Sequence, residues 1–173
     1  MVDIEPAKIA DTDAIRSVVT AAFDDETEAE LVEVLREEEA LRPDCSLVAR
    51  DDTVVGYVAV SSGELPAAPR LDIAILGPIG VVPNRQSDGI GSELIRTAMR
   101  YCVRTGCDAV VLEGDPSFYE QYGFEPAAAY GLDSDLDPAA GTFQVWPCKP
   151  GALSGVEGTV RHPIPFHAIE SVA

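Results

Sequence analysis

The chain has 173 residues, of which 46% are hydrophobic and 24% are charged, a composition typical of a folded globular protein rather than a disordered one. Thirty acidic residues against twelve basic ones give a formal net charge of −18, which disfavours nucleic acids and anionic membrane surfaces as partners. No apolar run approaches the roughly 20 residues of a membrane-spanning helix, and Met1–Glu5 shows no signal-peptide pattern, so we expect a cytoplasmic protein.

The acidity is unusual because only Lys8 and Lys149 are lysines. Excess Asp and Glu with almost no Lys suits a high-salt cytoplasm, where charge repulsion is screened over about 3 Å at about 1 M salt. The simpler interpretation is an acidic protein that its surface charge keeps soluble. We favour the halophilic interpretation.

The first part of the chain predicts strands and helices in alternation. In chain order they are a strand at Val2–Ile9, a helix capped by Asp11 or Thr12, a helix at Thr27–Leu41, and strands at Ser46–Ala49 and Val54–Ser61. Asp51-Asp52-Thr53 makes a tight polar turn between the last two strands, which therefore form a hairpin. Leu71–Val82 is predicted to be a long strand, with a bulge or splay at Gly77-Pro78.

The most regular helix follows this strand. Its apolar stripe comprises Ile90, Leu94, Ile95, Ala98, Met99, Cys102 and Val103, and Thr105-Gly106 ends it. The remaining predicted elements are strands at Ala109–Leu112, Phe143–Trp146 and Thr159–His162 and a short helix at Pro116–Tyr122. The pattern predicts one α/β or α+β domain over residues 1–173, with a partly antiparallel sheet that residues 125–173 complete.

The junction between the long strand and the regular helix contains two glycines, Gly89 and Gly91. Unpaired N–H groups and a partial positive charge at a helix N-terminus can hold a phosphate. The segment lacks the G-x-x-x-x-G-K-[ST] pattern of a nucleotide P-loop, and Leu94 stands where a dinucleotide fingerprint needs its third glycine. A tight strand-to-helix turn would explain two glycines equally well.

Two longer motifs favour a ligand loop. Gln86-x-x-Gly89-x-Gly91, after an apolar strand that ends at Pro83, resembles the acetyl-coenzyme A loop of the GNAT superfamily of N-acetyltransferases. Downstream, the run from Phe118 to Phe124 resembles that family's Tyr-x-x-x-Gly-Phe element. The tail resembles a bacterial and archaeal branch of the family whose members are predicted to acetylate unidentified substrates.

The resemblance implies a GNAT-like fold with splayed central strands and flanking helices, acetyl-CoA as co-substrate and no metal. The residues that it assigns to the cofactor are Val81, Gln86, Ser87, Asp88, Gly89, Ile90, Gly91 and Ser92. By this resemblance the backbone of Val81 pairs with the pantetheine arm, a strand amide near Val81 stabilises the oxyanion, and the amides of residues 86–92 hold the pyrophosphate. Ser87 and Asp88 depart from the family pattern, and a carboxylate beside a pyrophosphate is unfavourable unless Arg85 offsets it.

The catalytic residues that the resemblance implies are a tyrosine and a carboxylate. Tyr119 would protonate the coenzyme A thiolate, since a phenol with a pKa of about 10 is protonated at neutral pH. The alternative is that its ring only packs on the sheet. Glu113 would act through water as a general base for the amine, but it could equally be a sheet-edge carboxylate, and Asp72 and Asp115 are no worse candidates by sequence alone.

The function that follows is direct transfer of an acetyl group from acetyl-CoA to a primary amine of a small molecule or peptide; a homodimer stays open. The competing hypothesis is a non-catalytic acyl-CoA-binding or regulatory module. The four cysteines have no metal-ligand spacing, and in an intracellular protein we expect no structural disulfides. Cys102 falls on the helix stripe and is expected in the core, and Cys107 has no flanking base, so we expect no cysteine nucleophile. We expect His162 and His167 at the surface or in loops rather than at a metal.

Overall fold

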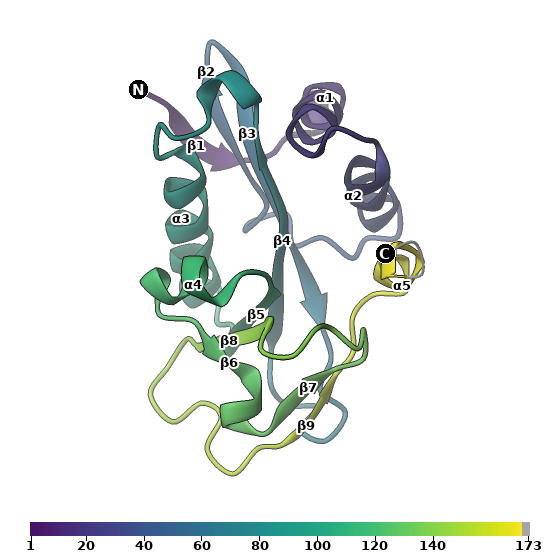
Figure 1. Cartoon of the computed structure of the whole chain (residues 1–173), viewed down its shortest axis with the longest axis vertical. Coiled ribbons are helices and arrows are strands. Elements are labelled where there is room, and N and C mark those ends of the chain that lie inside the picture. Colours follow the sequence, from purple (N-terminus) through teal and green to yellow (C-terminus); the bar gives the residue numbers. More distant parts are fainter. Residues whose placement is uncertain (171–173) are drawn as a thin grey trace.

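The computed structural model describes residues 1–170 and centres on one mixed sheet (Figure 1). Seven strands lie in the order β1-β2-β3-β4-β5-β8-β6, and all neighbours are antiparallel except β4 and β5. Their bounds are β1 Asp3–Pro6, β2 Leu47–Asp51, β3 Thr53–Gly63, β4 Ile73–Val81, β5 Ala109–Glu113, β8 Phe143–Pro147 and β6 Glu125–Pro126. The expected β2–β3 hairpin is present, with Asp52 at its turn.

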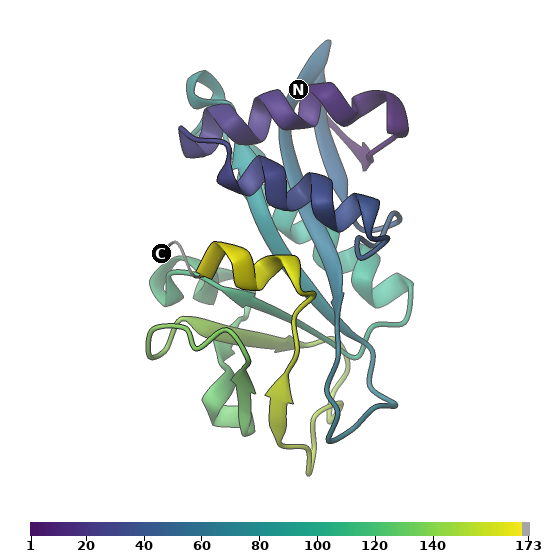
Figure 2. The same ribbon diagram turned by 90° about the vertical axis from the view of Figure 1, so that its right-hand side faces the viewer.

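Helices cover both faces of this sheet. The α-helices are α1 Thr12–Phe23, α2 Thr27–Glu37, α3 Ile90–Arg104, α4 Pro116–Tyr119 and α5 Pro165–Glu170. The 3-10 helices are η1 Ile9–Asp11, η2 Pro83–Arg85, η3 Glu120–Tyr122 and η4 Ala127–Tyr130. Helix α3 lies on one face, whereas α1, α2 and α5 lie one beside the next across the other (Figures 1 and 2). None of the described helices is long and apolar enough to span a bilayer.

The apolar stripe of α3 explains why this helix packs where it does. Six of its seven predicted members are buried against β2, β3, β4 and β5, and Cys102 is among them, as expected. Val103 is the exception, since 42% of its surface is exposed. On the opposite face, one apolar cluster joins α1 and α2 to β2 and β3, and a second joins β4, β5 and β8 to the C-terminal segment.

Three N-terminal expectations need correction. The first strand ends at Pro6, before a 3-10 turn at Ile9–Asp11, and α2 ends at Glu37 rather than at Leu41. Asp11 directly precedes α1, but its carboxylate does not cap that helix. It accepts the backbone N–H of Lys8 and pairs with Arg50 instead.

The predicted interruption of the long strand is a bulge. Val58 lies opposite Ile79 and Val60 opposite Leu76, so β4 carries one extra residue around Gly77-Pro78. β4 pairs with β5 only over Ile73–Ile75 and Ala109–Val111. Within residues 1–170, no strand pairs with the rest of β4 on the side that faces β5, so β4 and β5 separate as a splayed pair. This splay is the feature of the fold that creates a site.

The C-terminal part of the chain completes the sheet only partly. β8 and β6 extend it, but the strand expected at Thr159–His162 spans Gly158–Val160 as β9 and pairs with β7 (Leu132–Ser134) in a separate parallel sheet. The following segment leads to α5, which packs beside α2. This arrangement places the C-terminal segment on the face opposite α3.

Candidate functional site

The open edge of β4 presents backbone groups at the splay. Val82 donates its N–H to the carbonyl of Val55 on β3 at 2.9 Å. Because hydrogen-bonded and non-hydrogen-bonded pairs alternate along an antiparallel ladder, the N–H and C=O of Val81 point away from β3. The Val81 carbonyl accepts the side-chain amide of Gln86 at 3.0 Å, and the Val81 N–H lies on the same open side. The strand therefore offers a backbone donor to an extended ligand.

The connection from β4 to α3 is a compact turn that ends in a left-handed residue. It begins with η2 and an extended Gln86. Ser87 (φ +73°) and Gly89 (φ +83°) then have positive φ angles, and Gly89 directly precedes the first turn of α3. Gly91 follows in that first turn, where an added Cβ would meet only Val81 Cγ2, at 3.9 Å. The Ile90 side chain is buried in the core, so this residue presents only backbone to the loop. The space before α3 is thus kept clear for a group that uses the helix N–H donors.

Charge at this loop is shared between one arginine and two carboxylates. Arg85 donates from Nε to Asp88 at 3.2 Å and from Nη1 to Asp51 at 3.0 Å. Hydrogen bonds to Asp88 and then to Asp51 raise the pKa of Arg85 above its ordinary value. Asp88 is therefore offset by Arg85 and is exposed to solvent. A cavity of about 770 Å³ opens against the loop, lined by Met1, Val2, Arg85, Asp88, Gly89, Ile90 and Glu93.

Tyr119 ends α4 and packs its ring against the turn after β5. A Cβ on Gly114 would lie only 2.5 Å from Tyr119 Cε2, so the close approach of the ring requires glycine there. Burial, followed by the neighbouring Tyr122, raises the pKa of Tyr119 above 10. Among the described residues, none forms a hydrogen bond with the Tyr119 hydroxyl. The residue is a protonated phenol at neutral pH and also packs on the core.

Tyr122 is a site residue that the sequence reasoning did not single out. Its hydroxyl lies 2.6 Å from Ser92 Oγ in the first turn of α3, and the Arg96 guanidinium lies 4.9 Å from its ring centroid. Its ring centroid is 6.2 Å from that of Tyr119. This contact joins the start of α3, directly after the glycine loop, to the Phe118–Phe124 segment that contains Tyr119. The three-residue spacing from Tyr119 is the only sequence signal for it.

The structure separates the three candidate bases. Asp72 pairs with Arg42 at the start of β4, at the far end of that strand from Val81. Asp115 accepts the N–H and the hydroxyl of Ser117 and caps α4. Glu113 ends β5 and is exposed, and by alternation it lies with Ala109 and Val111 on the face away from α3. Of the three candidate bases, Glu113 is the one that lies at the splay on that face.

His162 lies in the loop between β9 and α5, as expected, but it is buried rather than at the surface. Its side chain is only 4% exposed, and its Nδ1 lies 2.8 Å from Asp135 Oδ1. Asp135 also accepts the His162 backbone N–H, at 3.1 Å, and lies 3.0 Å from Nε2 of the exposed His167 on α5. The carboxylate therefore fastens the C-terminal segment to the loop after β7. This cluster is a structural contact, and no group of side chains within residues 1–170 is arranged to hold a metal ion.

Comparison with known proteins identifies the motifs as those of one family. The model of the acetyltransferase (GNAT) family matches residues 12–124, which include both the loop and the tyrosine element. The uncharacterized N-acetyltransferase YjhQ of Escherichia coli K12 is 39% identical over 124 residues, which are 69% of this chain and 67% of YjhQ. The uncharacterized N-acetyltransferase YhbS of the same strain is 32% identical over 154 residues, which are 88% of this chain and 90% of YhbS.

Two solved structures share both the fold and the sequence pattern. The crystal structure of YhbS from E. coli in complex with CoA matches with a TM-score of 0.90 and 31% identity, covering 95% of this chain and 91% of YhbS. A GNAT family acetyltransferase from Brucella melitensis in complex with acetyl-CoA matches with a TM-score of 0.79 and 30% identity, covering 96% of this chain and 98% of that one.

Proposed function

The chain belongs to the acetyltransferase (GNAT) family and is an N-acetyltransferase, and from this premise we propose that it moves the acetyl group of acetyl-CoA directly to a primary amine. The observation that carries the proposal is the open edge of β4: the Val81 N–H faces the gap between the splayed strands, directly beside the loop that begins α3. An elongated amide-containing ligand with a phosphate end fits such an edge.

Binding of the cofactor uses backbone more than side chains. The Val81 N–H pairs with the pantetheine arm, and the amides of residues 86–92 surround the pyrophosphate at the positive end of α3. Space at Gly91 admits the phosphates, because an added Cβ there has only one protein contact within 4 Å. Gln86 holds the Val81 carbonyl and so fixes the edge that the pantetheine arm would join. Arg85 neutralises part of the charge that Asp88 brings to this loop.

The chemistry divides between the two faces of the splay. Glu113, on the face away from α3, takes a proton from the acceptor amine through water, and the amine nitrogen then attacks the thioester carbonyl. A strand amide near Val81 stabilises the oxyanion of the tetrahedral intermediate. When the carbon–sulfur bond breaks, Tyr119 donates its proton to the departing thiolate. The acceptor is a small molecule or a peptide that approaches from the Glu113 side.

The test is a thiol-release assay with a panel of primary amines, run beside a calorimetric titration with CoA. We expect micromolar-range CoA binding and amine-dependent release of free CoA, with acetylated amine as the second product. CoA binding with no amine-dependent release across small amines, amino acids and peptide N-termini would instead favour a non-catalytic acyl-CoA-binding module. A chain that binds no CoA would contradict both.

A further inference from the structure

Two cysteines meet at the C-terminal cap of α3. Gly106, with φ +93°, donates its N–H to the carbonyl of Val103 at 3.1 Å, and Cys107 donates to the carbonyl of Cys102 at 2.9 Å. This pair of bonds defines a Schellman motif, in which the side chains at the positions of Cys102 and Cys107 characteristically touch. Apolar side chains usually form that contact. Here both are free, buried thiols.

The backbone geometry at this cap suits a disulfide. Two residues joined by a backbone hydrogen bond of 2.9 Å have Cα atoms no more than about 6.8 Å apart, within the range that disulfides span. The motif also directs both side chains to the same side of the cap. A bond between Cys102 and Cys107 therefore needs little backbone movement.

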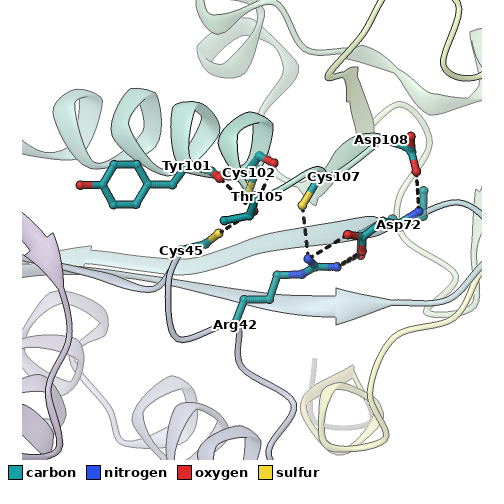
Figure 3. A network of polar contacts seen from close by, with 9 residues as sticks. Arg42, Cys45, Asp72, Tyr101, Cys102, Thr105, Cys107 and Asp108 are labelled. Atoms are coloured by element: carbon teal, nitrogen blue, oxygen red, sulfur yellow. Dashed lines mark hydrogen bonds and ion pairs between the residues drawn. The ribbon is translucent and has the colours of Figure 1, made fainter.

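A half-buried arginine, Arg42, distinguishes the two thiols (Figure 3). Arg42 donates from Nη1 to Cys107 Sγ at 3.3 Å, while its Nη2 pairs with Asp72 and donates to the Ile73 carbonyl at 3.1 Å. The Cys102 thiol and the Arg42 guanidinium lower the pKa of Cys107 below 9.0, although burial opposes them. The Cys107 and Cys45 thiols, together with burial, raise the pKa of Cys102. Within this pair, the contact with Arg42 favours Cys107 as the nucleophile and leaves Cys102 as its resolving partner.

We propose that Cys102 and Cys107 form a redox-active dithiol that a low-molecular-weight disulfide converts to an intramolecular disulfide. The Cys107 thiolate attacks one sulfur of the oxidant, forming a mixed disulfide and releasing one thiolate. Cys102 then loses its proton and attacks the Cys107 sulfur, which releases the second thiol. The two protein thiols lose two electrons, and the oxidant gains them as it becomes two thiols.

The dithiol lies at the C-terminal end of α3, whereas the loop of residues 86–89 lies at its N-terminal end. The helix has 15 residues, so about 22 Å of rise separate the two ends. Both cysteines are buried, whereas Arg42 and Asp72 are partly exposed beside them, so the proposed reaction requires the last turn of α3 to open on that side. The reaction is therefore separate from acetyl transfer and does not depend on it.

The experiment is incubation of the folded chain with oxidised glutathione, followed by alkylation, trypsin digestion and mass mapping without reduction. Trypsin cuts after Arg100 and Arg104, so Cys102 leaves on the peptide 101–104 and Cys107 on the peptide that begins at Thr105. The second peptide also contains Cys148, so the same measurement is made on Cys148→Ala. We expect the two peptides to be joined, with the loss of two hydrogens, in both proteins.

Matched variants test the assignment of roles. Cys102→Ala should stop at a glutathione adduct on Cys107, Cys107→Ala should form no linkage, and Cys45→Ala should behave as wild type. Arg42→Gln should slow the reaction about tenfold near neutral pH, whereas Arg42→Lys, which keeps a cation, should lose less. A linkage that uses Cys45 or Cys148, a glutathione adduct as the end product of the wild type, or no reaction of the folded wild type would each overturn the proposal.

Discussion

The hydroxyl groups of Ser92 and Tyr122 lie 2.6 Å apart and join the first turn of α3 to the segment that carries Tyr119. The contact gives the Tyr122 hydroxyl a partner, whereas the Tyr119 hydroxyl has no hydrogen-bond partner among the described residues. Two tyrosines with ring centroids 6.2 Å apart thus have different environments, which supports the proposal that Tyr119, and not Tyr122, is the acid.

Removing the hydroxyl of Tyr119 tests the acid. Tyr119→Phe keeps the ring that packs against Gly114, so melting temperature and acetyl-CoA affinity should barely change. Turnover should fall by ~10²-fold or more if protonation of the thiolate limits the rate. The matched variant is Tyr122→Phe, which removes the hydroxyl bonded to Ser92 and should have the smaller effect on turnover. Intact turnover in Tyr119→Phe would assign the proton to water or another group.

The base is tested by Glu113→Gln, which keeps the shape of the side chain and removes its basicity. Turnover with an amine that is protonated at neutral pH should fall about 10²-fold and recover partly as pH rises, because more of the amine is then already neutral. Glu37→Gln, at an exposed position on α2, serves as the control for loss of one negative charge. Equal turnover in the two variants would leave Glu113 as a sheet-edge carboxylate.

Salt should strengthen both the fold and cofactor binding. The chain carries a net charge of −18 and places Asp88 at its phosphate loop, so polyanionic CoA and the protein repel each other at low ionic strength. The range of this repulsion falls from ~30 Å at 0.01 M salt to ~3 Å at 1 M. Melting temperature and acetyl-CoA affinity should therefore both rise towards molar potassium chloride.

A matched pair of variants separates the loop charge from the overall charge. Asp88→Asn should raise acetyl-CoA affinity at low salt and flatten its salt dependence, whereas Asp44→Asn, exposed elsewhere, should do so less. Flat or falling curves for the wild type would remove the halophilic interpretation and leave the acidity as a solubility feature.

The Asp135 contact predicts acid sensitivity of the C-terminal segment. Burial opposes the charged form of Asp135, but the hydrogen bonds from His162 and His167 lower its pKa below 3.8. Because the folded-state pKa lies below that of the unfolded chain, the carboxylate stabilises the fold above about pH 3.9, and this is lost as pH falls through the folded-state value. Asp135→Asn should cost ~1–3 kcal/mol at pH 7 and less at pH 3.

Asp133→Asn, on β7 two residues before Asp135 and exposed, is the control for Asp135→Asn. Thermal melts of both variants at the two pH values give the comparison. A cost that is the same at pH 3 as at pH 7 would show that packing, not the carboxylate, holds the segment.

Local chemistry made much of this fold predictable. The apolar stripe of α3, its end at Thr105-Gly106 and the bulge at Gly77-Pro78 all depend on neighbouring residues, and the structure confirms them. A strand was predicted at Thr159–His162, close to β9, but its partner β7 was missed because three residues are too few for a period to be visible. Val103 continued the helical spacing, yet 42% of its surface is exposed. The spacing of apolar residues shows which side chains share a face of a helix, but not how far along the helix its packing partner extends.

The candidate site was predictable to the extent that its residues lie in two contiguous motifs. The burial of His162 was not predicted because its partner, Asp135, is 27 residues away, and sequence spacing carries no signal for such a contact. The choice among Glu113, Asp72 and Asp115 likewise needed the structure. It depends on which end of each strand meets the splay, and strand register alone decides that.

The central claim, that the loop before α3 holds the pyrophosphate of acetyl-CoA, is tested most directly at Gly91. Calorimetric titration with acetyl-CoA should show affinity that falls from wild type to Gly91→Ala to Gly91→Val, by more than about tenfold at valine, or roughly 1.4 kcal/mol. Melting temperature should change little, because an added Cβ meets only Val81 Cγ2, at 3.9 Å. Wild-type affinity in a folded Gly91→Val would contradict the account and reduce the loop to a strand-to-helix turn.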